Sequence, residues 1–420
     1  MSRLSKTHRK HTFHHWGMIF TRLDLMQSIA VIALLTVSVF FIRTTDIQLE
    51  RIISPFWKKQ IVWIGVGIVA WTFFAFTNYK LFQHWWWIVY LLAIILLIAV
   101  LIPEIGIKIK GARRWLEFGG IRFQPSELGK FAVIISVSFL ISIKDFSVNK
   151  LPHLLLLILV VAIPFVLIAI EPDLGSALVI FPLVASLLFV AEIKWKYAIP
   201  IILIVMFGYL FRITVFETLK EYKVLKEYQL KRIEIFLNPE SDIKGRGWHQ
   251  YQANLAVGSG GFWGKGLGNG TQNTLGYLPE THTDFIFSVI AEEGGFVGCM
   301  ILLGLYGLLF LSVLRTAIFA RDRFGRALAI GIGTLLFFHT FVNIGMSIGL
   351  TPVTGLPLPL VSYGGSFIVI TMMYLGILQS IYAHRKRMNE GSKNVGSGKI
   401  KTRILSQTIR MKTKKMKGMF

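Results

Sequence analysis

Residues 84–102 read HWWWIVYLLAIILLIAVLI, a run of 19 residues without a single Asp, Glu, Lys or Arg. A helix needs about 20 mostly apolar residues to cross the hydrocarbon core of a bilayer, so this run predicts a membrane-spanning helix. The same length rule, applied outward along the chain, finds ten candidates. They are residues 24–43, 57–77, 84–102, 123–143, 152–170, 174–192, 196–213, 285–313, 325–348 and 362–383.

The overall composition agrees with a chain that lies mostly in lipid. Its 420 residues are 54% hydrophobic, and the mean hydropathy is +0.61, well above that of a typical soluble domain. The single cysteine, Cys299, excludes a disulfide framework. The predicted fold class is all-α: a polytopic membrane protein with about ten transmembrane helices and one long outer loop.

Both ends of the chain are strongly basic, within a net charge of +23. By the positive-inside rule both ends are predicted to be cytoplasmic, as an even number of spans requires. We therefore divide the chain into a basic N-terminal tail (1–23), a ten-helix membrane domain (24–384) with an extracytoplasmic loop at 214–283, and a basic C-terminal tail (385–420). The tails are expected to rest on anionic lipids rather than on nucleic acid.

The short loop 103–122 breaks the positive-inside rule, because the same topology places it outside. It carries two acids and five basic residues: Glu104, Glu117, Lys108, Lys110, Arg113, Arg114 and Arg122. A few tolerated charges would explain this, since the rule is a tendency. A site for phosphate oxygens, held by the guanidinium groups of Arg113 and Arg114, is the interpretation that we favour.

The long outer loop contains two distinct segments. Residues 216–236 place apolar side chains at three-residue spacing among several lysines, which predicts an amphipathic helix on the membrane surface. Residues 258–270 include seven glycines but match no nucleotide-binding motif, so a flexible backbone folded back into a cavity is expected. Near the end of the chain, residues 352–359 are rich in proline and predict a stiff outer segment.

Several ionisable residues fall within the predicted spans, where charge is costly and usually faces a partner or a cavity. Glu127 and Lys130 are three residues apart and can pair, either for substrate binding or merely to fix helix packing. Asp284 and Glu292, with Ser288 between them at four-residue spacing, would line one polar face of the eighth span.

Asp284 and two histidines of this region each allow another interpretation, as a helix cap and as metal ligands. Asp284 follows Thr283 at the start of a predicted helix, where either residue would make a good N-cap. His249 and His282 suggest a metal, but no third ligand is clustered with them, so no metal site is predicted.

Six motifs occur in a fixed order. They are Gly111-Ala-Arg-Arg-Trp115, Phe123-Gln-Pro-Ser-Glu-Leu-Gly-Lys130, Glu171-Pro-Asp-Leu-Gly175, Asn269-Gly-Thr-Gln272, Leu278-Pro-Glu-Thr-His-Thr-Asp-Phe-Ile-Phe287 and Gly355-Leu-Pro-Leu-Pro-Leu-Val-Ser-Tyr-Gly-Gly365. Together they resemble the shape, elongation, division and sporulation family of RodA and FtsW proteins, over roughly residues 25–382, with the greater similarity to RodA. Phe367 departs from the family, which usually has a second small hydroxyl residue there.

The resemblance implies a multi-pass protein of the bacterial cytoplasmic membrane with peptidoglycan glycosyltransferase activity on lipid II. It implies a class B penicillin-binding protein and membrane proteins of the elongation complex as partners. Asp284 matches the family's essential acid. The residues expected to bind substrate are Arg113, Arg114, Glu127, Lys130, Glu280, His282, Glu292 and Ser362. No cofactor is expected, although a divalent cation that assists the pyrophosphate stays open.

Two other functions remain open at this point. A lipid II flippase would also need a polar cleft among several spans, but transporters often contain internal repeats, and no convincing repeat is visible here. A non-catalytic scaffold for wall-synthesis partners would tolerate the loss of Asp284. The sequence does not decide between elongation, division and sporulation, nor does it fix the oligomeric state.

Overall fold

The computed structural model describes residues 23–48, 55–109, 112–171, 173–194, 196, 246–278 and 280–385. The predicted span over 196–213, the amphipathic segment 216–236 and the two basic tails lie almost wholly outside these residues, so their predictions stay predictions. The described part of the long loop, which begins at residue 246, contains helices α12 (Arg246–Ser259) and α13 (Thr271–Thr274).

Nine helices coincide with the nine other predicted spans. They are α2 (Leu25–Gln48), α3 (Phe56–Phe76), α5 (Trp86–Leu101), α6 (Pro125–Ser142), α7 (Leu151–Ile170), α8 (Leu174–Val190), α14 (Ile286–Phe319), α15 (Arg323–Ser347) and α16 (Gly365–Ala383). All except α5 and α8 are long and apolar enough to cross a membrane on their own, and those two are shorter apolar helices. The predicted polytopic helical fold is confirmed.

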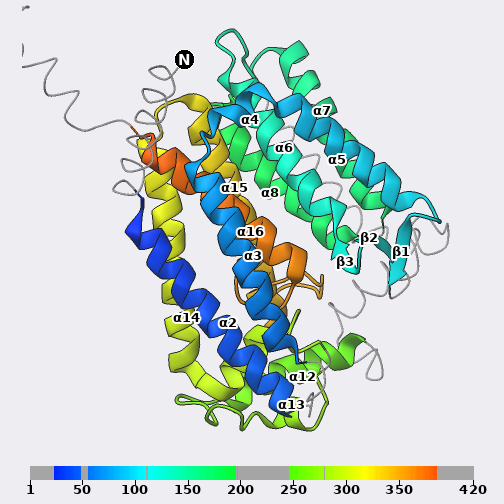
Figure 1. Cartoon of the computed structure of the whole chain (residues 1–420), viewed down its shortest axis with the longest axis vertical. Helices are drawn as coiled ribbons and strands as arrows, with labels where there is room; N and C mark the ends of the chain where they lie inside the picture. The colour runs from blue at the N-terminus through cyan, green and yellow to red at the C-terminus, as the bar shows by residue number, and fades with distance from the viewer. Residues whose placement is uncertain are drawn as a thin grey trace, which may run out of the picture.

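The helices form one bundle in which burial varies strongly from helix to helix (Figure 1). In α6, 83% of the most apolar 18-residue stretch is buried inside the protein, whereas in α7 the corresponding share is 22%. Helix α6 packs against α5 and α15, while α16 packs along α3 and α14 lies against α2 and α15. Because the outer helices expose apolar side chains, their outward faces suit lipid rather than water. A short helix, α4 (Lys80–His84), joins α3 to α5.

The basic loop between α5 and α6 is folded as a small antiparallel sheet, which the sequence analysis did not predict. Its strands are β1 (Gly106–Ile109), β2 (Ala112–Phe118) and β3 (Ile121–Phe123), in that order. Gly119 and Gly120 connect β2 to β3 with φ of 58° and 81°. Positive φ at both residues of a two-residue hairpin loop is typical of a type I′ turn and favours glycine.

Helix α14 is interrupted at Gly295, which has φ 62° and ψ −162°. The interruption leaves backbone groups on both sides without partners inside the helix. The glycine-rich segment supplies these partners through four hydrogen bonds: Lys265 N to Glu292 O (3.0 Å), Gly266 N to Glu293 O (3.0 Å), Phe296 N to Gly261 O (2.9 Å) and Val297 N to Phe262 O (3.2 Å). The segment is thus a hydrogen-bonded cover for the break.

Glycines are required where this cover meets the helix. A Cβ atom on Gly264 would lie 2.2 Å from the carbonyl oxygen of Glu293, and one on Gly295 would lie 2.2 Å from the amide nitrogen of Gly264. Neither distance is compatible with a side chain. The glycine-rich segment was predicted to fold back, and the contacts show that its glycines serve close backbone approach.

Candidate active site

Asp284 lies in a turn just before α14. The N-cap of α14 is Phe285, and no side chain caps this end. The alternative reading of Asp284 as a cap is therefore wrong, and so is the predicted helical face shared with Glu292, since the helix begins only at Ile286. Glu280, at φ 54°, accepts the backbone amides of the next turn, including that of Asp284 at 3.1 Å.

The carboxylate of Asp284 faces the proline-rich segment 352–359. A Cβ atom placed on Gly355, which has φ 78°, would lie 3.4 Å from Oδ2 of Asp284. Asn343 of α15 holds the two segments together, because its Nδ2 donates to the carbonyl oxygens of Asp284 (2.9 Å) and Leu356 (2.8 Å). The position of the carboxylate is thus set by contacts between segments far apart in the sequence.

Ser362 and His282 support this turn. The Oγ of Ser362 donates to the carbonyl oxygen of Thr283 at 2.6 Å and accepts from the amide of Leu358 at 2.8 Å. The ring of His282 stacks on Phe56 with centroids 4.2 Å apart. Their described contacts orient the turn that carries Asp284, and the predicted binding of substrate by both residues stays a prediction.

Glu280 has a similar local role. Its Oε2 accepts from the hydroxyl of Thr283 at 3.3 Å, beside the backbone bonds that close the turn. A left-handed backbone at a residue other than glycine is uncommon and marks a tightly determined position. Glu280 therefore contributes to the shape of the turn, and its predicted contact with substrate stays a prediction.

Arg114 on β2 forms an ion pair with Asp173, with 3.5 Å between Nη1 and Oδ1. Asp173 is well anchored: it caps α8 by accepting the amide of Ser176 at 3.2 Å and also accepts from Nε2 of Gln124 at 3.0 Å. The register between β1 and β2 shifts here, because Trp115 pairs with Ile107 and Arg113 with Lys108, so Arg114 is the extra residue of a β-bulge. Arg114 is the arginine of the predicted pair for which the described residues give an ion pair with Asp173, and a role for Arg113 stays a prediction.

The proline-rich segment connects the arginine cluster to Asp284. Gly175, in the first turn of α8, approaches this segment so closely that a Cβ atom would lie 3.0 Å from the carbonyl oxygen of Thr354. The next residue, Gly355, faces Asp284. The segment thus lies between the N-terminus of α8 and the turn of Asp284, at the end of the bundle that also carries the β-sheet and α12 (Figure 1).

Glu171 is a residue of this cluster that the sequence analysis quoted in a motif but did not assign. Its side chain is fully buried, and neither carboxyl oxygen has a hydrogen-bond partner within the residues that the structure describes. Burial, together with the nearby Asp173 carboxylate, raises the pKa of Glu171 to about 9, while the Arg114 guanidinium opposes the shift. Glu171 is therefore uncharged at neutral pH, and Asp173 is the charged carboxylate that pairs with Arg114 in the described part of the chain.

Glu127 and Lys130 form the predicted ion pair, at 2.7 Å, with side chains only 3% and 0% exposed. The Nζ of Lys130 is also 3.1 Å from Nε2 of His339 on α15. The hydroxyl of Tyr374 on α16 donates to the carbonyl oxygen of Glu127 at 3.1 Å. These contacts join three helices, so they agree with the packing reading, and substrate binding by the pair stays a prediction.

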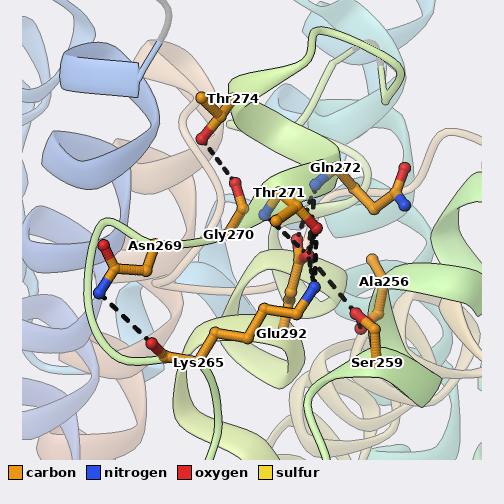
Figure 2. Close-up of polar contacts among 9 residues, drawn as sticks. All are labelled: Ala256, Ser259, Lys265, Asn269, Gly270, Thr271, Gln272, Thr274 and Glu292. Carbon is orange, nitrogen blue, oxygen red and sulfur yellow. Dashed lines mark hydrogen bonds and ion pairs between the residues drawn. The ribbon is translucent and has the colours of Figure 1, made fainter.

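Glu292 is the acceptor at the centre of the glycine-rich loop (Figure 2). Its Oε1 accepts from Lys265 Nζ at 2.6 Å, from the amide and hydroxyl of Thr271 at 2.9 Å each, and from the amide of Gln272 at 3.2 Å. The side chain is 1% exposed. These contacts anchor the loop, and the predicted contact of Glu292 with substrate stays a prediction.

The fold and the cluster of buried charges at one end of the bundle define a polytopic α-helical membrane protein with a polar site built from the connections between its helices. The sequence model of the FtsW, RodA and SpoVE family, described as cell cycle protein, matches residues 17–387. The chain belongs to this family.

Individual relatives agree with this assignment. The chain is 38% identical over 334 residues to the peptidoglycan glycosyltransferase MrdB of Escherichia coli K12, covering 79% of this chain and 87% of that protein. It is 38% identical over 336 residues to the probable peptidoglycan glycosyltransferase FtsW of Trichlorobacter lovleyi, covering 79% and 84%.

Two solved structures share the fold. One comes from a study of how a peptidoglycan synthase complex coordinates polymerization and crosslinking; it superposes with a TM-score of 0.72 at 28% identity, covering 87% of this chain and 99% of that one. The other is the rod shape determining protein RodA of Thermus thermophilus, with a TM-score of 0.63 at 26% identity, covering 87% and 98%.

Proposed function

We propose that this chain polymerises lipid II into glycan strands at the outer face of the bacterial cytoplasmic membrane, with Asp284 as the general base. In its class of activity it is a peptidoglycan glycosyltransferase, like the relatives to which it is similar. The observation that carries the site proposal is the position of the Asp284 carboxylate: it faces Gly355 of the proline-rich segment, and the preceding Thr354 approaches Gly175, two residues from the Asp173 partner of Arg114.

The proposed reaction joins two lipid-linked sugars. The 4-hydroxyl of the acceptor attacks the anomeric carbon of the donor, the bond from that carbon to the pyrophosphate breaks, and the configuration inverts. Asp284 accepts the hydroxyl proton. A positioned general base typically contributes 10²–10⁴-fold in rate. The carbonyl oxygen of Glu280, which accepts backbone amides, and the side-chain amide of Asn343, which donates to the carbonyl oxygen of Asp284, hold this turn in place before substrate arrives.

Arg114 is proposed to neutralise the charge that develops on the leaving pyrophosphate. A guanidinium group suits phosphate oxygens because it donates two parallel hydrogen bonds. Asp173 holds the guanidinium in position, and a neutral Glu171 adds no negative charge to that of Asp173. Lys130 and Arg113 belong to the proposed anion-binding set on sequence grounds.

The partners and topology follow the family. We propose a class B penicillin-binding protein and other membrane proteins of the elongation complex as partners, with both termini cytoplasmic and the basic tails on anionic lipids. No resident cofactor is proposed. Assistance by a divalent cation is tested directly, by adding a chelator and then Mg²⁺ or Mn²⁺ to the polymerisation assay.

The decisive experiment incubates the purified chain, with and without its partner, with labelled lipid II and resolves the products on a gel. Asp284→Ala is expected to abolish the glycan ladder while the protein keeps its melting temperature in detergent. Asp145→Ala, an exposed acid in the connection between α6 and α7, is the matched control and is expected to keep the ladder.

Three outcomes would contradict the proposal. A ladder from Asp284→Ala would refute the base assignment. Translocation of lipid II across vesicles by the wild-type chain without any ladder would instead support a flippase. Wall synthesis in cells that depends on the chain but tolerates Asp284→Ala would support a scaffold.

A further inference from the structure

A cavity of about 100 Å³ lies at the end of the bundle opposite Asp284, where α6 and α8 end and α15 begins. Its lining includes the apolar side chains of Phe146, Val148 and Val190, together with the charged residues Glu192, Arg323 and Arg326. This volume suffices for a compact polar group such as a phosphate. The cavity is remote from every residue of the proposed active site.

Arg323 and Arg326 are one turn apart on α15, and both are exposed. Within the described part of the chain neither guanidinium forms an ion pair. Like charges at this spacing on a helix repel each other. An anion held between them would remove that repulsion, and two guanidinium groups match the oxygens of a phosphate diester.

Glu192 occupies a position that normally belongs to glycine. It follows the C-cap of α8 with φ 57°, and the amides of Glu192 and Ile193 donate to the carbonyl oxygens of Phe189 (3.0 Å) and Leu188 (3.2 Å). This is the Schellman arrangement, whose left-handed residue is usually glycine. Glycine would adopt this conformation without strain, so a carboxylate at the cavity rim calls for another explanation.

We propose that the cavity binds the headgroup of a zwitterionic phospholipid, with the phosphate on Arg323 and Arg326 and the amine on Glu192. The two cations and one anion of the cavity match the phosphate and ammonium groups of phosphatidylethanolamine. The source is a lipid rather than a free ion because apolar side chains line part of the cavity and others are exposed close to them in sequence: Phe189, which precedes the lining residue Val190, is 83% exposed, and Leu151, three residues after Val148, is 58% exposed.

Native mass spectrometry of the full chain, released from micelles that contain defined lipids, tests the proposal. The wild-type chain is expected to retain phosphatidylethanolamine in preference to phosphatidylglycerol. Arg323→Ala/Arg326→Ala should bind both lipids at least about tenfold more weakly, as expected for the loss of a charge-assisted contact. Glu192→Gly should lose the preference for the amine while it keeps phosphatidylglycerol binding.

Two controls make the test specific. Arg321→Ala removes an exposed arginine from the same end of the bundle but outside the cavity lining, and should retain lipid as the wild type does. Equal losses of lipid retention in Arg321→Ala and in the double variant would show that lipid binding depends only on general surface charge, and would overturn the proposal. Unchanged retention by the double variant would overturn it too, as would displacement of the lipid by inorganic phosphate at equal concentration.

Discussion

Replacing Glu292 tests whether this carboxylate anchors the glycine-rich loop or touches substrate. Its Oε1 accepts four hydrogen bonds of 2.6–3.2 Å, one from Lys265, two from Thr271 and one from Gln272. Removing one partner of a buried ion pair costs about 3–5 kcal/mol. Lys265 keeps 26% of its side chain exposed, so water compensates part of the loss and we expect the lower end of this range for Glu292→Ala.

Hydrogen–deuterium exchange of residues 260–272 measures this loss directly. A decrease of about 3 kcal/mol in local stability corresponds to roughly a hundredfold faster exchange of amides that open with the loop. Glu292→Gln keeps an acceptor but loses the charge, so its effect should be smaller. Glu104→Gln, an exposed acid of the connection after α5, is the control and should leave exchange in the loop unchanged.

The opposite result would refute the anchoring role. If Glu292→Gln abolishes the glycan ladder while exchange in the loop stays at the wild-type rate, the carboxylate acts on substrate. The sequence-based assignment would then be correct, and the contacts in Figure 2 would be secondary. If Glu292 anchors the loop, Glu292→Ala should lose both the glycan ladder and the protection of the loop from exchange. Glu292→Gln should retain part of both.

Three further predictions concern stability in detergent. The pKa of Glu171 in the folded chain, about 9, exceeds its ordinary value of 4.5. Between these two pH values only the folded chain keeps the proton on Glu171. The stability of the wild type therefore falls as pH rises, by up to about 1.4 kcal/mol per pH unit. Glu171→Gln should lose this dependence on pH. Melting temperatures that fall equally with pH in the wild type and in Glu171→Gln would contradict the argument. Gly295→Ala should destabilise by at least about 1–3 kcal/mol because its backbone is left-handed, whereas Gly294→Ala meets no atom within 4 Å and should not. Lys130→Met should cost about 3–5 kcal/mol by leaving Glu127 buried without its cation, and Glu127→Gln/Lys130→Met should recover most of it; equal losses would show that no such coupling exists.

Segment length and hydropathy sufficed to place the nine described spans, because a helix that crosses a bilayer needs about 20 mostly apolar residues. The sheet after α5 was missed because its strands are only three to seven residues long, too short for a periodic signal. Gly119-Gly120 was the one local indication of a hairpin, since paired glycines favour its turn.

The site was predicted in its residue types more than in its contacts. Glu127 and Lys130 were paired correctly because three-residue spacing on a helix brings side chains together. The link between Lys265 and Glu292 spans 27 residues, and the approach of Gly355 to Asp284 spans more still, so no local pattern could have found them. Glu171 was overlooked because its unusual feature, burial without a partner, exists only in the folded chain.

The break in α14 also indicates how deeply the protein lies in its bilayer. Residues 296–314 contain no Asp, Glu, Lys or Arg, and Arg315 follows them. Nineteen helical residues rise about 28 Å, close to the roughly 30 Å of hydrocarbon. We therefore expect the crossing to end near Gly295, which would place Glu292 and its loop at the level of the lipid phosphates. Phe262 and Trp263, 59% and 77% exposed, sit where aromatic rings commonly mark that boundary.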